Sequence, residues 1–221
     1  MSPSRYRLLP MAQPGIRESI RAAISHEART GKFRRHLKQR LSAVREKLIL
    51  PDEEPIDALM GFVVDYVESV PGSLALVTAV SKQYSFYDYA EPFLRMAEDY
   101  FLDPPDELPV DGGLEALLDE AFLAHRVLEE VNDHHIRHLH RPLVPVDMTE
   151  ANLIVHYLLG DSFATALEQR VQQTAAGLLD REYIWDRVKM IPGRSPSDIV
   201  PISSHSFRNG RPAVRLRLSG G

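Results

Sequence analysis

Apolar residues recur every three or four positions through most of this chain, and this periodicity limits its fold more than any other feature. Such spacing places the apolar side chains of a segment on one face of an α-helix. Stripes of this kind run through residues 16–24, 33–48, 56–67, 114–131 and 153–178. We therefore predict an all-α, multi-helix bundle, a single domain covering roughly residues 15–180.

Proline and glycine residues mark where these helices are expected to end. Gly31 separates the first two helices, and Pro51 closes the second. The third is expected to start at Pro55 and to stop at Pro71-Gly72, because proline cannot donate the backbone hydrogen bond of a helix interior. Two longer helices are expected at about 114–139 and 149–179, with Gly160 marking a kink or a close helix crossing in the second.

Two further segments are distinguished by their composition. Residues 84–101 hold seven aromatic side chains out of 8 Phe, 8 Tyr and 1 Trp in the chain, which is typical of a buried core or a subunit interface. In the tail, residues 213–218 alternate at strand period and could pair with 199–207 in a hairpin around Asn209-Gly210. The alternative is a tail that becomes strand-like only on a partner.

A net charge of −5 conceals a strong partition of charge along the chain. Residues 1–48 hold 12 Lys or Arg against 3 acids, residues 49–150 hold 5 against 22, and residues 181–221 hold 8 against 3. We accordingly expect a basic helical arm (residues 1–50), packed on or extending from a helical core domain (51–180), and a basic C-terminal tail (181–221). The arm could dock on the acidic body of its own chain, a second copy, another protein, an anionic membrane or nucleic acid.

Several classes of function are excluded or unsupported. The chain has no cysteine, which excludes disulfides, thiolate catalysis and cysteine-based metal sites. Phosphate-binding glycine loops and a serine nucleophile elbow are absent, and His26-Glu27 departs from the zinc-protease motif because Thr30 stands where the second histidine is needed. No apolar run approaches the roughly 18 residues of a membrane span, and the start lacks a secretory signal. A cytoplasmic location is expected.

One set of residues could bind a metal ion. His125 and Glu129 lie one turn apart on the predicted helix 114–139, near its apolar stripe, and Asp161 and Glu168 lie near the stripe of the next helix. If the two helices are antiparallel neighbours, these four residues would form a mixed His/carboxylate site suited to iron, manganese or zinc. The alternative is a buried hydrogen bond between histidine and carboxylate, without a metal.

A second cluster comprises Glu130, His134 and His138, spaced four residues apart on the face expected to be exposed to solvent. Two histidines one turn apart bind zinc or nickel adventitiously. They also lie in the last turns of the helix, where positive charge complements the helix dipole.

Three functions remain open. The first is a non-enzymatic interaction or regulatory protein, oligomeric, that docks through its oppositely charged blocks. The second is a metal-binding helical bundle, such as an iron or manganese oxidoreductase. The third is nucleic-acid binding through residues 1–48. The charge partition and the lack of a motif that identifies catalytic residues favour the first.

Overall fold

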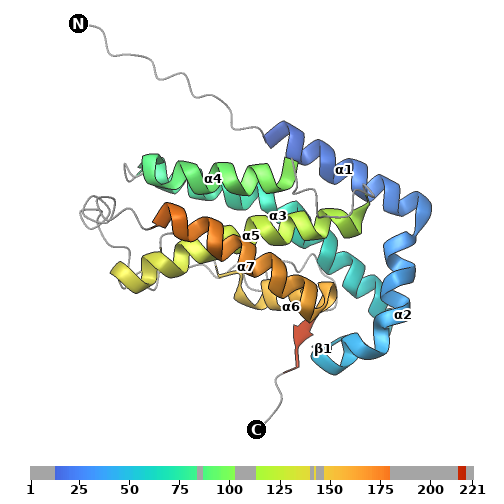
Figure 1. The fold of residues 1–221 in the computed structure, drawn as a ribbon. Helices are drawn as coiled ribbons and strands as arrows, with labels where there is room; N and C mark the ends of the chain where they lie inside the picture. Colours follow the sequence, from blue (N-terminus) through green and yellow to red (C-terminus); the bar gives the residue numbers. More distant parts are fainter. Residues whose placement is uncertain are drawn as a thin grey trace, which may run out of the picture.

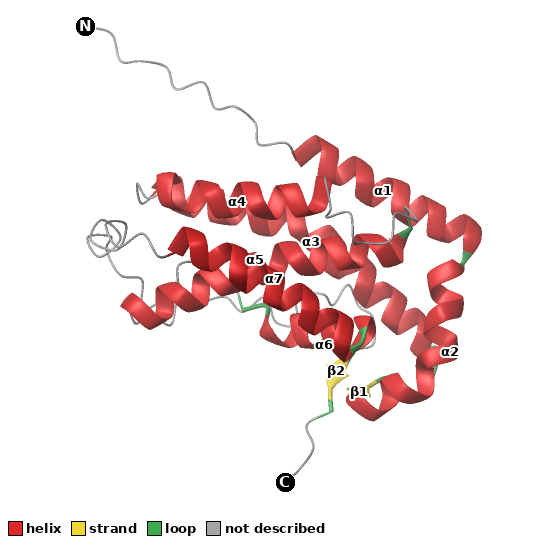
Figure 2. Cartoon of the chain, in the orientation of Figure 1, coloured by secondary structure: helices red, strands yellow, loops and turns green. Residues whose placement is uncertain are grey.

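The computed structural model describes residues 13–83, 87–102, 113–139, 142, 147–179 and 214–217. Within them, seven helices and one pair of short strands form a helical bundle, which confirms the predicted fold class (Figures 1 and 2). The elements are α1 (Gln13–Thr30), α2 (Lys32–Lys47), β1 (Leu48–Ile49), α3 (Pro55–Gln83), α4 (Tyr87–Leu102), α5 (Leu114–Leu139), α6 (Thr149–Leu159), α7 (Asp161–Leu179) and β2 (Arg215–Leu216).

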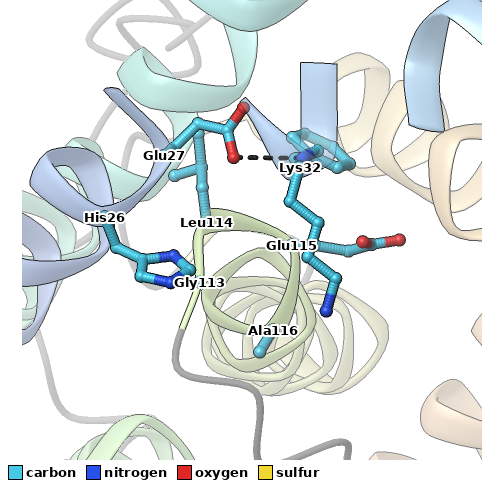
Figure 3. Close-up of a pocket in the computed structure, with 8 residues that line it drawn as sticks. His26, Glu27, Lys32, Gly113, Leu114, Glu115 and Ala116 are labelled. Carbon is cyan, nitrogen blue, oxygen red and sulfur yellow. Dashed lines mark hydrogen bonds between the residues drawn. The ribbon is translucent and has the colours of Figure 1, made fainter. Parts of the chain in front are cut away.

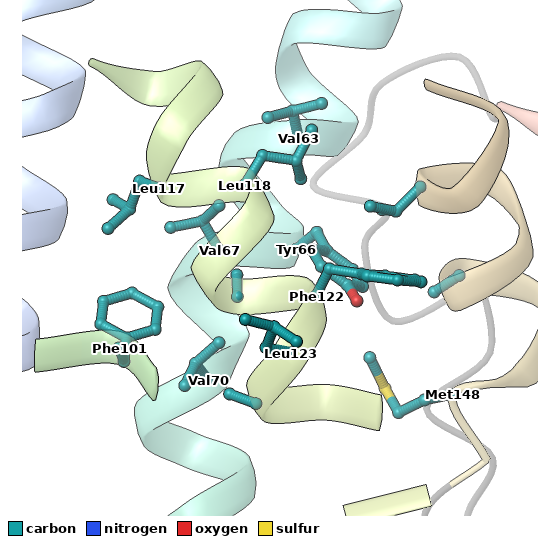
Figure 4. Close-up of a cluster of buried hydrophobic side chains, with 14 of the residues drawn as sticks. Val63, Tyr66, Val67, Val70, Phe101, Leu117, Leu118, Phe122, Leu123 and Met148 are labelled. Atoms are coloured by element: carbon teal, nitrogen blue, oxygen red, sulfur yellow. The ribbon is translucent and has the colours of Figure 1, made fainter. Parts of the chain in front are cut away.

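Helix α5 lies at the centre of the bundle. Helices α1, α3, α4, α6 and α7 all pack against it. Leu117 and Phe122 point to opposite sides of α5, Leu117 lying on the side of Phe101 and Phe122 on the side of Tyr66 (Figure 4). A helix packed on one side needs only one apolar stripe, whereas α5 buries side chains around much of its circumference.

The aromatic segment forms α4 and contributes to the same core. Tyr89, Phe93, Tyr100 and Phe101 are buried in it, in accordance with the expected core role of this segment. Residues 84–86 lie outside the described residues.

The basic N-terminal block packs on the bundle through apolar side chains. Ile16 and Ile20 of α1, together with Phe33, Leu37 and Val44 of α2, belong to the same hydrophobic core as α3 to α7. Apart from the buried Glu27, the charged side chains of these helices lie mainly on the other side of each stripe. Apolar burial, rather than charge attraction, therefore holds the block in place.

Helix α3 continues through Pro71, so the prediction that a helix ends at Pro71-Gly72 is wrong. An interior proline costs a helix about 3 kcal/mol. On either side of Pro71, Val67, Val70, Leu74 and Val77 are buried in the core, and burying each such side chain contributes roughly 1.5–3 kcal/mol. Packing on both sides of the proline thus outweighs its local cost.

Because it is continuous, α3 also reaches the length of a membrane span, although charged residues interrupt it and it contains no unbroken apolar run of that length. With 29 residues, α3 is long and apolar enough to cross one by length and composition. Half of its most apolar 18-residue window is buried inside the bundle. Core helices of soluble proteins pass the same test, so length and composition do not assign α3 to a membrane.

The predicted helix 149–179 is divided in two at Gly160. Helix α6 ends at Leu159 and α7 begins at Asp161. Gly160 adopts φ 99° and ψ 138°, a backbone conformation that residues other than glycine rarely adopt. The glycine therefore produces a break between helices instead of the expected kink.

Strand β2 pairs antiparallel with β1, with Leu48 opposite Leu216 and Ile49 opposite Arg215. The strand predicted in residues 213–218 is therefore present, but its partner in the described chain is the end of the N-terminal block. Residues 199–207, the expected hairpin partner, lie outside the described residues.

The corner between α1 and α2 depends on two residues. Gly31 has φ 57°, in the left-handed region, and lets the chain turn between the helices. The buried carboxylate of Glu27 accepts hydrogen bonds from the backbone N–H groups of Phe33 and Arg34, each at 3.0 Å. A side chain of α1 thus satisfies the free donors at the start of α2.

Gly31→Ala is expected to lower the free energy of unfolding by about 1 kcal/mol, because an L-residue in the left-handed region costs roughly 1–2 kcal/mol. Gly72→Ala is the matched control. Gly72 is exposed within α3, and a Cβ there would meet nothing within 4 Å. The control should raise stability by about 0.5–1 kcal/mol through helix propensity. Urea denaturation followed by circular dichroism measures both changes. If both variants gained or both lost stability, Gly31 would not be required for the left-handed turn.

Candidate functional site

Among the four predicted metal ligands, His125 is fully buried and faces α3. Its Nε2 lies 3.0 Å from Ser69 Oγ and 3.3 Å from the backbone oxygen of Tyr66. The rings of His125 and Tyr66 lie 4.7 Å apart between centroids. The partners recorded for this histidine thus belong to α3, and none is a carboxylate.

Arg126 brings Glu129 and Glu168 together. Its guanidinium forms an ion pair with Glu129 one turn along α5, and its Nε lies 3.6 Å from Glu168 Oε1 on α7. Only 18% of the Arg126 side chain is exposed, against 12% for Glu129 and 25% for Glu168. A guanidinium therefore lies between two of the carboxylates that were expected to bind a metal ion.

Asp161 joins this group only at its edge. His156 Nδ1 lies 3.3 Å from Glu168 Oε1, and His156 Nε2 lies 3.6 Å from Asp161 Oδ1. The Asp161 side chain is 71% exposed. Asp161 and Glu168 therefore flank one histidine, but that histidine is His156 of α6 and not His125 of α5.

Hydrogen bonds extend the cluster to α3. The Tyr66 hydroxyl donates to Asn152 Oδ1 at 2.7 Å, and Asn152 Nδ2 donates to Glu129 Oε2 at 2.5 Å. A continuous set of polar contacts therefore joins α3, α5, α6 and α7. This core polar network comprises Tyr66, Arg126, Glu129, Asn152, His156 and Glu168.

The surroundings of the network shift the pKa values of several groups. Burial lowers the pKa of His125 to about 4, so this histidine is neutral near pH 7. Burial also raises the pKa of Tyr66, and Glu129 adds to that shift. Burial opposes the charge on Arg126, but Glu129 and Glu168 outweigh it and raise the pKa. The network therefore holds a neutral phenol and one permanent cation placed between two carboxylates.

Four of the six network residues were not among the predicted site residues. Arg126 could have been recognised, because Glu129 follows it by three residues and therefore lies on the same face of the helix. Tyr66, Asn152 and His156 carry no comparable signal, since they enter the network through contacts between distant segments. In the part of the chain that the structure describes, no group of three or more His, Asp or Glu side chains could hold a metal ion.

Two further carboxyl groups of α5 lie in the bundle, Asp119 buried and Glu120 half-buried. Burial, with the neighbouring Glu115 and Glu120, raises the pKa of Asp119 to about 8. Burial likewise raises the pKa of Glu120 to about 7. Both groups favour the protonated form in the folded protein, so they favour folding at low pH. The lowered pKa of His125 has the opposite effect, because it favours folding at high pH.

Glu130 does not lie on a solvent-exposed face, so that part of the second predicted cluster is wrong. Its residue exposure is 9%, and its Oε1 lies 3.6 Å from Arg137 Nη2. The prediction assumed that α5 has one buried face, whereas the other helices surround it. The side chains of His134 and His138 lie outside the described residues.

A small cavity lies between the α1–α2 corner and the first turn of α5 (Figure 3). Its volume is about 60 Å³, far below the roughly 300–1,000 Å³ typical of sites for drug-sized ligands. Both carboxylates in its wall have partners: Glu27 caps α2, and Glu115 Oε1 lies 2.5 Å from His36 Nδ1. The polar wall therefore serves mainly to join the helices. The cavity is lined by His26, Glu27, Lys32, Phe33, Gly113, Leu114, Glu115 and Ala116.

The two basic blocks of the sequence meet on one surface. The Arg217 backbone N–H donates to the Lys47 carbonyl at 2.8 Å, and Arg217 Nε donates to the Arg45 carbonyl at 3.2 Å. Strand β2 thus places its arginines beside the end of α2 (Figure 2). We call this the α2–β2 basic surface. It consists of the exposed residues Arg35, Lys38, Arg45, Lys47, Arg215 and Arg217.

No residue of the α2–β2 basic surface forms an ion pair with a carboxylate of the described chain. Arg35 donates to the Thr30 carbonyl at 2.7 Å, and the Lys47 ammonium lies 5.6 Å from the ring centroid of Tyr157. By contrast, the neighbouring Arg34 pairs with Asp57 at 2.5 Å. The surface therefore presents a net positive charge, which the charge of Asp57 near Lys38 and the exposed Glu46 between Arg45 and Lys47 offset only in part.

Comparison of the chain with protein-family models, with curated proteins and with solved structures gave no match. Function is therefore inferred from the geometry alone.

Proposed function

We propose that this protein is a non-enzymatic interaction protein that docks an anionic partner on the α2–β2 basic surface. The observation that carries the proposal is the β1–β2 pairing, which joins cations from the two ends of the chain in one exposed group. Unpaired surface charges add little to stability, since even paired ones contribute only about 0–1 kcal/mol. They are, however, well suited to attract and orient a partner of opposite charge.

The alternative of docking on the protein's own acidic body accounts for few of these charges. Arg34 pairs with Asp57, and His36 contacts Glu115. The six members of the α2–β2 basic surface remain exposed and make no such pair with a described residue. An external anionic partner is therefore the better explanation of the surface.

A second copy of the chain is one such partner. Helices α3 and α4 expose Asp57, Glu68, Asp88 and Asp99. Contact between a basic surface of one copy and an acidic surface of another would produce a head-to-tail assembly. Sedimentation velocity at about 50 and 500 mM salt tests this form of docking, because salt screens exposed charges and should dissociate the assembly.

Removing charge from the surface is expected to weaken retention on immobilised heparin, used as a generic polyanion. The Lys38→Gln/Arg45→Gln variant should elute at clearly lower salt than the wild type, because two exposed cations are lost. The Lys82→Gln/Arg95→Gln variant has the same net charge but changes α3 and α4, and it should elute close to the wild type. Equal elution of the two variants would show that retention reflects net charge and would contradict the proposal.

A further inference from the structure

The α2–β2 basic surface also indicates what kind of anion it binds, an inference that rests on the proposed function. We propose that it binds the phosphate backbone of double-stranded nucleic acid, without reading the base sequence. The chain from Ala28 to Arg45 contains no acidic residue, and it crosses the α1–α2 corner and most of α2. A long, uninterrupted positive segment suits a partner with closely and regularly spaced negative charges.

The geometry of α2 matches the charge spacing of a duplex. Arg35, Lys38 and Arg45 lie on the exposed side of the helix, opposite the buried Phe33, Leu37 and Val44. Arg45 follows Arg35 by ten positions, which corresponds to about 15 Å at 1.5 Å per residue. Each strand of a duplex carries one phosphate per 3.4 Å of helix axis, so this length spans about four phosphates.

Strand β2 extends the surface beyond the end of α2. Arg217 contacts the carbonyls of Arg45 and Lys47, so its guanidinium lies at the C-terminal end of the row. Arg215 is two residues away and shares the same face of the strand. A second set of phosphate contacts is therefore available where α2 ends.

The character of the surface favours a phosphate backbone over a lipid surface or a protein partner, a second copy of the chain included. Protein interfaces are held together by apolar and aromatic anchors at their centre, whereas the exposed side of α2 carries only charged and polar residues and Ala43. The adjoining strand exposes one large apolar side chain, Ile49. Helices that bind membranes insert large apolar residues between the lipids, and this side of α2 exposes no apolar residue larger than Ala43.

The described residues of the α2–β2 basic surface include no exposed aromatic side chain, which favours a duplex over a single strand. Proteins that bind single strands stack the bases on aromatic side chains. The aromatic residue of α2, Phe33, is buried, and Tyr157 beside Lys47 is half-buried. The surface therefore offers phosphate contacts and no stacking platform in its described part.

Acidic residues border the surface along the start of α3. Asp57 pairs with Arg34, and both Asp57 and Glu54 raise the pKa of Arg34 through their charges. A polyanion on α2 would be repelled by Asp57 and would compete with it for Arg34. Neutralising Asp57 should therefore strengthen binding, which distinguishes a phosphate partner from a structural role of the cations.

Binding is tested by fluorescence anisotropy with labelled DNA duplexes of about 20 base pairs in roughly 50–200 mM salt. For about four phosphate contacts, the logarithm of the association constant should fall with the logarithm of salt concentration with a slope near −3.6. Two duplexes of unrelated sequence should bind alike. Lys38→Gln/Arg45→Gln should reduce the slope by about two, Lys82→Gln/Arg95→Gln should leave it unchanged, and Asp57→Asn should tighten binding several-fold.

The outcomes separate this inference from the proposed function. If heparin retention depends on the surface but duplex does not bind at low salt, the nucleic-acid inference is overturned and the proposed function stands. Binding of polyglutamate in place of duplex would identify a protein partner. Binding of vesicles of phosphatidylcholine with phosphatidylserine in place of duplex would identify a membrane partner. Either result would also overturn the nucleic-acid inference. If Lys38→Gln/Arg45→Gln changes neither assay while circular dichroism shows a folded variant, both proposals fail.

Discussion

Replacing Arg126 with methionine is expected to lower the free energy of unfolding by about 3 kcal/mol, near the lower end of the range for breaking a buried ion pair. The substitution leaves Glu129 and Glu168 largely buried without their cation. Methionine retains most of the side-chain length, so the loss reflects charge more than volume. Urea denaturation followed by circular dichroism at pH 7 measures the change.

A companion variant separates the charge effect from packing. In Arg126→Met/Glu129→Leu/Glu168→Leu, all three charges are absent, and much of the lost stability should return, since apolar residues often replace buried ion pairs without loss. Asn152 would lose its acceptor in this variant, which limits the recovery. A loss below about 1 kcal/mol in Arg126→Met alone would show that the carboxylates do not depend on the guanidinium.

The second large effect is a loss of stability in acid that originates at His125. Burial holds its folded-state pKa at about 4, below the unfolded value of 6.5. The unfolded chain therefore binds the proton more tightly between these two values, and folding stability falls as pH decreases from 6.5 to 4. A shift of this size corresponds to about 3 kcal/mol, at 1.36 kcal/mol per pH unit.

Comparison with His125→Phe isolates this contribution. Asp119 and Glu120 have raised pKa values, so the stability they contribute is present at low pH and is lost as pH rises through about 7 to 8. Their effect is shared by both proteins and cancels in the difference. We expect the wild type to lose about 3 kcal/mol more than His125→Phe between pH 6.5 and 4. Parallel pH profiles from urea denaturation would show that His125 is not the responsible group.

The core polar network shows why the candidate site was predicted only in part. The partly buried position of Glu129 and Glu168 follows from helical periodicity, and the sequence indicated their proximity. The group between them could not be derived from periodicity, because the pairing depends on how α5 and α7 are rotated against each other. Arg126 lies between these carboxylates, and His125 turns towards Ser69 and Tyr66 of α3.

Local sequence patterns account for the helical class, the boundary at Gly31 and the apolar faces that join α1 and α2 to the core. These features depend on interactions within a few residues, which local spacing and backbone preference encode. Three features could not be derived from such patterns: α3 continues through Pro71, helices pack on several sides of α5, and β2 pairs with β1. Each of these outcomes depends on the sum of burial and hydrogen bonding between distant segments, which can outweigh a local preference worth about 3 kcal/mol.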